Sequence, residues 1–89
     1  MDFENAQKMK FLHPETFSAP SEEELNNIKK DNYVKVSIAD ERFWILVTKV
    51  EKSIIHGLVA NKLVMTNDHG YNYKDNITVS TDNVYDIQN

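Results

Sequence analysis

The strongest constraint on the fold is the stretch from Tyr33 to Asn61, whose pattern predicts three consecutive β-strands separated by polar turns. In the first strand Val34, Val36 and Ile38 alternate with other residues, and this period of two is typical of a strand with one buried face. The second strand, with the run Phe43 to Val47, is apolar on both faces at its centre. We therefore expect an antiparallel sheet in which this strand is central and residues 1–30 cover its second face.

The third strand and the C-terminal part of the chain complete the β pattern. Ile55, Gly57 and Val59 continue the inward face, and a glycine inside a strand predicts a bulge or a tight bend. The pattern as a whole predicts a mainly β fold, a small five-stranded antiparallel SH3-like barrel. The other expected elements are a short strand at Leu63-Val64-Met65, the loop Asn67-Asp68-His69-Gly70, a strand with Ile77 and Val79, a helical turn capped by Ser80-Thr81-Asp82-Asn83, and a last strand at Tyr85-Asp86-Ile87.

The first 30 residues predict two further parts of what we expect to be a single domain. Residues 1–20 contain three phenylalanines and two prolines, which predicts an N-terminal arm that packs on the barrel and is not one long helix. The alternative for the arm is a segment that becomes ordered on binding a partner. Residues 21–30 predict one short α-helix, because Ser21 and Glu24 can form a capping box and Lys29-Lys30 complements the helix C-terminus. Residues 31–89 form the predicted barrel.

The composition indicates in which compartment the protein acts and which kinds of partner it binds. The chain has 89 residues and no cysteine, whereas a secreted domain of this size would often carry disulfides. The sequence does not begin with the basic segment and apolar run of a signal peptide, so we expect a cytoplasmic protein without a membrane association. The net charge is −4, and residues 32–89 hold seven acids against six scattered Lys and Arg. Nucleic-acid binders usually present a basic stripe, so nucleic acid is the less favoured partner.

Several spaced motifs occur in one order along residues 31–88: Asp31-x-Tyr33-Val34-Lys35-Val36, Glu41-Arg42-Phe43-Trp44-Ile45, Gly57-x-Val59-x-Asn61-x-Leu63, His69-Gly70-x-x-Tyr73-x-Asp75-x-Ile77 and Val84-Tyr85-Asp86-Ile87. In this order they resemble a group of small bacterial and phage proteins, domains of unknown function with an SH3-like barrel. The resemblance implies the fold and supplies no catalytic residue. Lys74 stands where that pattern usually has glycine, so we expect Asn72 or Asn76 to take the left-handed position of the turn.

No residue pattern in the chain indicates catalysis or metal binding. Phosphate-binding loops need closely spaced glycines, and the two glycines of this chain are far apart. Asp68-His69 is better explained as part of a turn than as a metal site. Asp40-Glu41 falls in a hairpin turn, where two exposed acids would not make a catalytic carboxylate pair. We therefore expect a protein that is not an enzyme and that uses no cofactor or metal.

Five aromatic side chains are the candidate partner-binding site: Tyr33, Trp44, Tyr71, Tyr73 and Tyr85. The alternation places the first two on the non-core faces of adjacent strands, and an SH3-like closure would bring the others to the same edge. Such an edge can bind an extended peptide or enclose a cationic group. The leading hypothesis is therefore a non-enzymatic protein-binding module with an aromatic edge.

Three alternatives to this hypothesis stay open. Trp44 could be a packing residue covered by Phe11, Phe17 or Leu25. Tyr33, Tyr71 and Tyr73 could stack the bases of single-stranded RNA. The chain could also be a structural subunit that self-associates through an unpaired edge strand.

Overall fold

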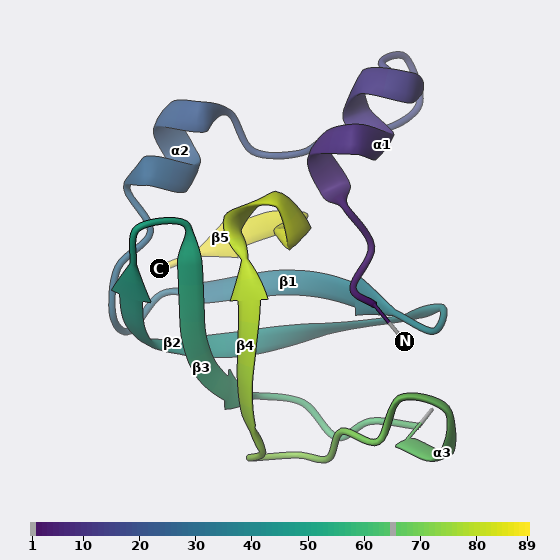
Figure 1. Cartoon of the computed structure of the whole chain (residues 1–89), viewed down its shortest axis with the longest axis vertical. Coiled ribbons are helices and arrows are strands. Elements are labelled where there is room, and N and C mark those ends of the chain that lie inside the picture. Colours follow the sequence, from purple (N-terminus) through teal and green to yellow (C-terminus); the bar gives the residue numbers. More distant parts are fainter. Residues whose placement is uncertain (1, 65) are drawn as a thin grey trace.

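The computed structural model describes residues 2–64 and 66–89 as a five-stranded antiparallel β-sheet with short helices (Figure 1). The two N-terminal helices lie at one end of the molecule and the third lies at the other end. The prediction of a mainly β chain with five antiparallel strands is confirmed. The elements in chain order are α1 (Ala6–Leu12), α2 (Glu22–Asn26), β1 (Tyr33–Ile38), β2 (Glu41–Glu51), β3 (Ile54–Val59), α3 (Thr66–His69), β4 (Asn76–Ser80), the 3₁₀ turn η1 (Thr81–Asn83) and β5 (Asp86–Gln88).

The strands are ordered β4-β3-β2-β1-β5, so the Trp-bearing strand β2 is central, as predicted. Within the described part of the chain β4 and β5 form the two edges and do not pair with each other. The sheet is therefore not closed into a barrel. Leu63 and Val64 of the expected short strand belong to no strand, and Met65 lies outside the described residues. The long connection instead contains α3, where the sequence predicted a loop.

A tight turn and a bulge set the register of β2 against its neighbours. Ala39 and Asp40 have φ angles of +50° and +63°, which corresponds to the two-residue type I′ turn favoured in β-hairpins. The pairing of β2 with β3 shifts between Val47 and Lys49, next to Gly57, so the bulge predicted at this glycine is confirmed. A Cβ atom on Gly57 would meet the backbone oxygen of the neighbouring strand at 2.5 Å, which explains why only glycine fits there.

One face of the sheet carries the hydrophobic core. The largest fully buried side chains include Phe43 and Ile45 of β2 and Ile55 of β3. Burying each of them stabilises the fold by about 1.5–3 kcal/mol relative to leaving it in water. Leu25 and Ile28 join this core from α2 and the residues that follow it. The opposite face of the sheet is called the outer face below.

The N-terminal arm packs along β1 and over one end of the core. The Glu4 amide donates a hydrogen bond to the Ser37 carbonyl oxygen at 2.8 Å, which satisfies a free backbone acceptor of β1. The ring of Phe3 lies 6.4 Å from the ring of Phe43 in an edge-to-face contact, a favoured geometry for two aromatic side chains. The arm also contains α1, which buries Ala6 and comes in addition to the one predicted helix.

The capping box predicted for α2 is confirmed. The Ser21 hydroxyl oxygen accepts from the Glu24 amide at 3.2 Å, and the Glu24 carboxylate accepts from the Ser21 amide at 3.0 Å. The predicted end of this helix near Lys30 is wrong, because α2 ends at Asn26 and has no basic residue in its last turn. The Asn32 side chain accepts from the Lys29 amide at 3.0 Å. This local hydrogen bond turns the chain into β1 and replaces a further helical turn.

Candidate binding surface

The outer face of the three central strands carries an apolar row at a position where antiparallel sheets commonly present polar side chains to water. Tyr33 of β1 is paired with Leu46 of β2, and Leu46 is paired with Leu58 of β3. Directly opposed residues of antiparallel strands point to the same face, so these three side chains lie side by side. Tyr33 is 37% exposed, and the two leucines are half-buried. The row is therefore accessible from solvent and is not part of the core.

The apolar row forms part of a groove, called the outer groove below. The outer groove has a volume of about 280 Å³ and is lined by Tyr33, Leu46, Leu58, Val59, Ala60, Tyr73 and Lys74. Pockets for whole drug-sized ligands have volumes of about 300–1,000 Å³. The outer groove lies just below this range, and its volume accommodates apolar side chains of a larger partner.

The turn before β4 is held against β3 by backbone hydrogen bonds. The Lys74 amide donates to the Val59 carbonyl oxygen at 2.8 Å, and the Val59 amide donates to the Asp75 carbonyl oxygen at 3.0 Å. Lys74 itself has a φ angle of +71°. The expectation that Asn72 or Asn76 takes the left-handed position is therefore wrong. The two-way bonding to Val59 imposes this backbone conformation on the lysine.

Trp44 lies on the outer face beside the outer groove, and its side chain is half-buried. It shares a shallow depression of about 190 Å³ with Tyr33. The ammonium nitrogen of Lys35 lies 5.6 Å from the centre of the indole ring, within the range of a cation–π contact. The Trp44 amide donates to Oδ1 of Asn61 at 2.6 Å, which fixes the start of the long connection on β2.

The three residues expected to cover Trp44 pack elsewhere. Leu25 belongs to the core on the other face of the sheet. The ring of Phe17 lies 4.9 Å from the ring of Tyr85, and Phe11 is 84% exposed. The prediction that Trp44 packs against these residues is thus wrong, because the arm approaches the outer face beside Lys35 and Arg42 instead.

The five aromatic residues predicted to form one edge are divided between separate places. Tyr33, Trp44 and Tyr73 line the outer groove or the depression beside it. Tyr71 packs against the core instead, and Tyr85 contacts Phe17 near the arm. The prediction that all five aromatic residues form a single edge is therefore wrong. The alternation of the strands placed Tyr33 and Trp44 correctly, whereas the path of the long connection decides where the tyrosines after it lie.

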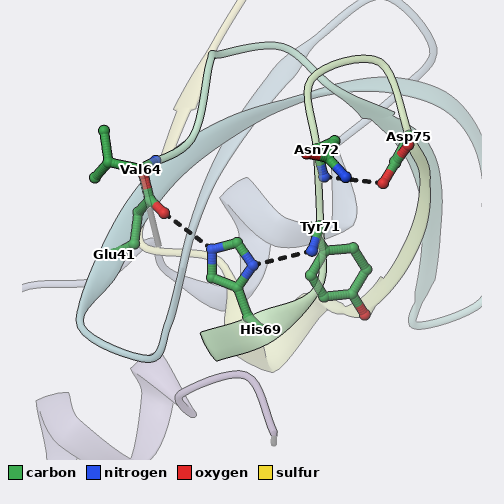
Figure 2. A network of polar contacts seen from close by, with 6 residues as sticks. All are labelled: Glu41, Val64, His69, Tyr71, Asn72 and Asp75. Carbon is green, nitrogen blue, oxygen red and sulfur yellow. Dashed lines mark hydrogen bonds and ion pairs between the residues drawn. The ribbon is translucent and has the colours of Figure 1, made fainter. Parts of the chain in front are cut away.

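A buried pair of Glu41 and His69 organises that connection (Figure 2). Nε2 of His69 lies 2.9 Å from Oε1 of Glu41, and the two side chains are 0% and 10% exposed. The second carboxylate oxygen of Glu41 accepts from the Val64 amide at 2.9 Å. The prediction that Glu41 is an exposed turn acid is therefore wrong. Sequence reasoning missed the pair because its members are 28 residues apart and no local pattern connects them.

The hydrogen bonds of His69 fix its chemistry. Nδ1 of His69 accepts from the Tyr71 amide at 3.0 Å, so the ring proton belongs on Nε2, where it is donated to Glu41. Both ring nitrogens are engaged and the side chain has no exposed surface. This arrangement suits a structural role, because neither nitrogen can reach a substrate or a metal ion. Within residues 2–64 and 66–89 no group of three or more His, Asp or Glu side chains could hold a metal ion.

Two carboxylates with shifted pKa values lie outside the outer groove. Hydrogen bonds from the Ser21 amide and hydroxyl lower the pKa of Glu24. A hydrogen bond from Lys49, at 3.0 Å, lowers the pKa of Glu51. Both shifts favour the charged carboxylate and keep it as an acceptor. Neither group is therefore prepared to act as a general acid near neutral pH.

No helix in the described part of the chain is long and apolar enough to cross a membrane. Comparisons with protein-family models, with curated proteins and with solved structures gave no match to this chain. The geometry of the outer face is accordingly the basis for a functional assignment.

Proposed function

We propose that this chain is a non-enzymatic SH3-like module that binds an extended segment of a partner protein in the outer groove. The strand order β4-β3-β2-β1-β5, with the 3₁₀ turn η1 between β4 and β5, supports the SH3-like assignment. The absence of cysteine supports a cytoplasmic site of action.

The observation that carries the proposal is the apolar row of Tyr33, Leu46 and Leu58 on the outer face. The core on the other face is complete without these side chains, so their apolar character is not required for packing. Contiguous apolar surface on a soluble domain commonly marks an interaction site. Tyr73 adds a second tyrosine ring at 47% exposure, and tyrosine is among the residue types that dominate binding energy at interfaces.

A peptide segment fits the groove better than a compact ligand does. The groove spans β1, β2 and β3, and an extended peptide that lies along these strands presents alternate side chains to it. The volume of about 280 Å³ accommodates a small number of these side chains. The partner side chains that enter are therefore apolar, and the polypeptide backbone of the partner stays at the surface.

Single-stranded RNA is a second candidate ligand because cations accompany the aromatic rings of the outer face. Lys74 Nζ lies 5.4 Å from the ring centre of Tyr73. Lys35 Nζ lies 5.6 Å from the ring centre of Trp44. In single-strand binders the bases stack on aromatic rings and the phosphates bind neighbouring cations. The net charge of −4 opposes it, and Tyr71 of the expected tyrosine trio lies in the core region.

The proposal is tested by selecting binders from a displayed library of random peptides with the full chain. The selected peptides are then titrated by calorimetry against wild type, Leu58→Ser and the control Phe11→Ala. We expect Leu58→Ser to weaken binding by about tenfold or more, as loss of an anchor residue does. The control removes an exposed side chain remote from the groove and leaves the affinity unchanged.

Three results would contradict the proposal. One is that no peptide is enriched, and another is that Leu58→Ser binds as wild type does. The third is a dimer that dissociates on dilution and is lost in Leu58→Ser, measured by light scattering, because a second copy would then occupy the groove. Binding of a mixed-sequence RNA oligonucleotide that competes with the peptides and weakens steeply with salt would favour the second candidate.

A further inference from the structure

A second cavity lies between the arm and the outer face, beyond Trp44 as seen from the outer groove. Its volume is about 360 Å³, and it is lined by residues 18–20 of the arm, Glu24, Lys35, Arg42, Tyr85 and Asp86. Lys35 links the second cavity to the depression at Trp44, because its ammonium group lies over Trp44 and its side chain lines the second cavity. The second cavity is called the basic pocket below for its two cations.

Arg42 makes a cation–π contact with Tyr85. Its guanidinium carbon lies 4.8 Å from the ring centre of Tyr85, and the other ring contact of Tyr85 is with Phe17 at 4.9 Å. A guanidinium group in contact with an aromatic face can still donate hydrogen bonds from its N–H groups. The hydroxyl of Tyr85 is buried and has no hydrogen-bond partner within the described residues.

Within the described part of the chain the two cations of the basic pocket have no acidic partner. Among the ion pairs of residues 2–64 and 66–89, none involves Lys35 or Arg42. The two acids of the pocket are engaged with backbone amides instead. The Glu24 carboxylate accepts from the Ser21 amide, and Asp86 Oδ1 accepts from the Ile87 amide at 2.8 Å.

The charge balance of the pocket decides which anion it can take. Two cations and two acids line it, so there is no net attraction for a free anion. A carboxylate that is tethered to a segment already bound in the outer groove meets the Arg42 donors at a high effective concentration. Arginine also matches the planar geometry of a carboxylate with two parallel hydrogen bonds.

The register of β2 gives the spacing between the two sites. Arg42 and Leu46 are four residues apart on the same strand, so they share a face and lie about 13 Å apart along it. An extended peptide has the same rise and the same alternation. We infer that the partner segment carries an acidic side chain four positions from its apolar anchor and binds it through Arg42 and Lys35. This inference rests on the proposed function of the outer groove.

The test uses a library of acetylated, amidated nonapeptides with a fixed central leucine and random flanks, selected on the full chain. We expect Asp or Glu to be enriched at an end position, four residues from the leucine. Replacing this acid by its amide should weaken binding to wild type by about fivefold, the upper range for an accessible ion pair. The same peptide change should have a smaller effect on Arg42→Gln, in which only Lys35 remains as a cation of the pocket, and the fold of this variant is checked by thermal unfolding.

Asp86→Asn should change the affinity for the acidic peptide in the opposite direction to Arg42→Gln, because it removes a negative charge beside the bound carboxylate. The acidic peptide should bind this variant more tightly than wild type, and weaker binding would mean that the pocket selects a cation and would overturn the inference. Enriched peptides that bind equally as acid and amide would overturn the inference and leave the outer groove as the binding site. Failure of every peptide to bind would reject both.

Discussion

Removal of the Glu41 carboxylate tests how the long connection between β3 and β4 is held. In Glu41→Ala, Nε2 of His69 loses its acceptor at 2.9 Å while the imidazole stays fully buried. A buried donor without a partner costs about 1–3 kcal/mol. The Val64 amide loses its acceptor as well, but Val64 is exposed and water can replace the bond. We therefore expect Glu41→Ala to lower the free energy of unfolding by about 1–3 kcal/mol, from a total of about 5–15 kcal/mol for a domain of ordinary stability.

Urea denaturation measures this loss, and amide hydrogen exchange locates it. The Tyr71 amide donates to Nδ1 of His69, so its protection should fall in Glu41→Ala more than that of the amides in β2. Glu41→Gln should have an intermediate effect, because a glutamine has one acceptor oxygen, whereas Nε2 of His69 and the Val64 amide bond to different carboxylate oxygens of Glu41. Asp40→Asn is the matched control in the adjacent, exposed turn position and should leave the stability unchanged. A loss below about 0.5 kcal/mol in Glu41→Ala, with unchanged protection of Tyr71, would refute the reasoning.

Three further predictions concern individual positions. Gly57→Ala should lower the free energy of unfolding by about 1–3 kcal/mol, since its Cβ would meet a backbone oxygen at 2.5 Å; an unchanged urea midpoint would contradict this. Lys74→Gly should raise the stability by about 0.5–1 kcal/mol in the same assay, because glycine removes the strain of a φ angle of +71°. The lowered pKa of Glu24 means that its charge stabilises the fold above the ordinary pKa of 4.5 and that this effect is lost as the pH falls through the folded-state pKa. The stability difference between wild type and Glu24→Gln should therefore shrink on acidification, and a difference that is constant with pH would contradict the assignment.

The elements that could be predicted from the sequence are those determined by residues close together in the chain. The capping box of Ser21 and Glu24 needs only a spacing of three, and the turn capped by Ser80 has the same kind of local cause. The alternation of β1 and β2 predicted which side chains face the core. The bulge at Gly57 could also be predicted, because a glycine is otherwise unfavourable in a strand.

The features that could not be predicted depend on the path of the long connection. His69 meets Glu41 across 28 residues, and neither residue differs in sequence context from an exposed turn residue. Tyr71 and Tyr73 are two positions apart, yet one packs against the core and the other lines the outer groove. The direction of each tyrosine follows from α3 and from the hydrogen bonds of the turn to Val59, which have no signature in the local sequence.

A central strand that is apolar on both faces has an unusual difficulty, because a slip of one residue would exchange its two faces with little loss of apolar burial. Three features of β2 and its neighbours oppose such a slip. The two-residue turn at Ala39-Asp40 fixes the pairing with β1. Gly57 fits only where its missing side chain faces the backbone at Leu46, and the Asn61 side chain binds the Trp44 amide. These three features allow Leu46 and Trp44 to stay on the outer face as apolar residues, as the binding surface that we propose requires.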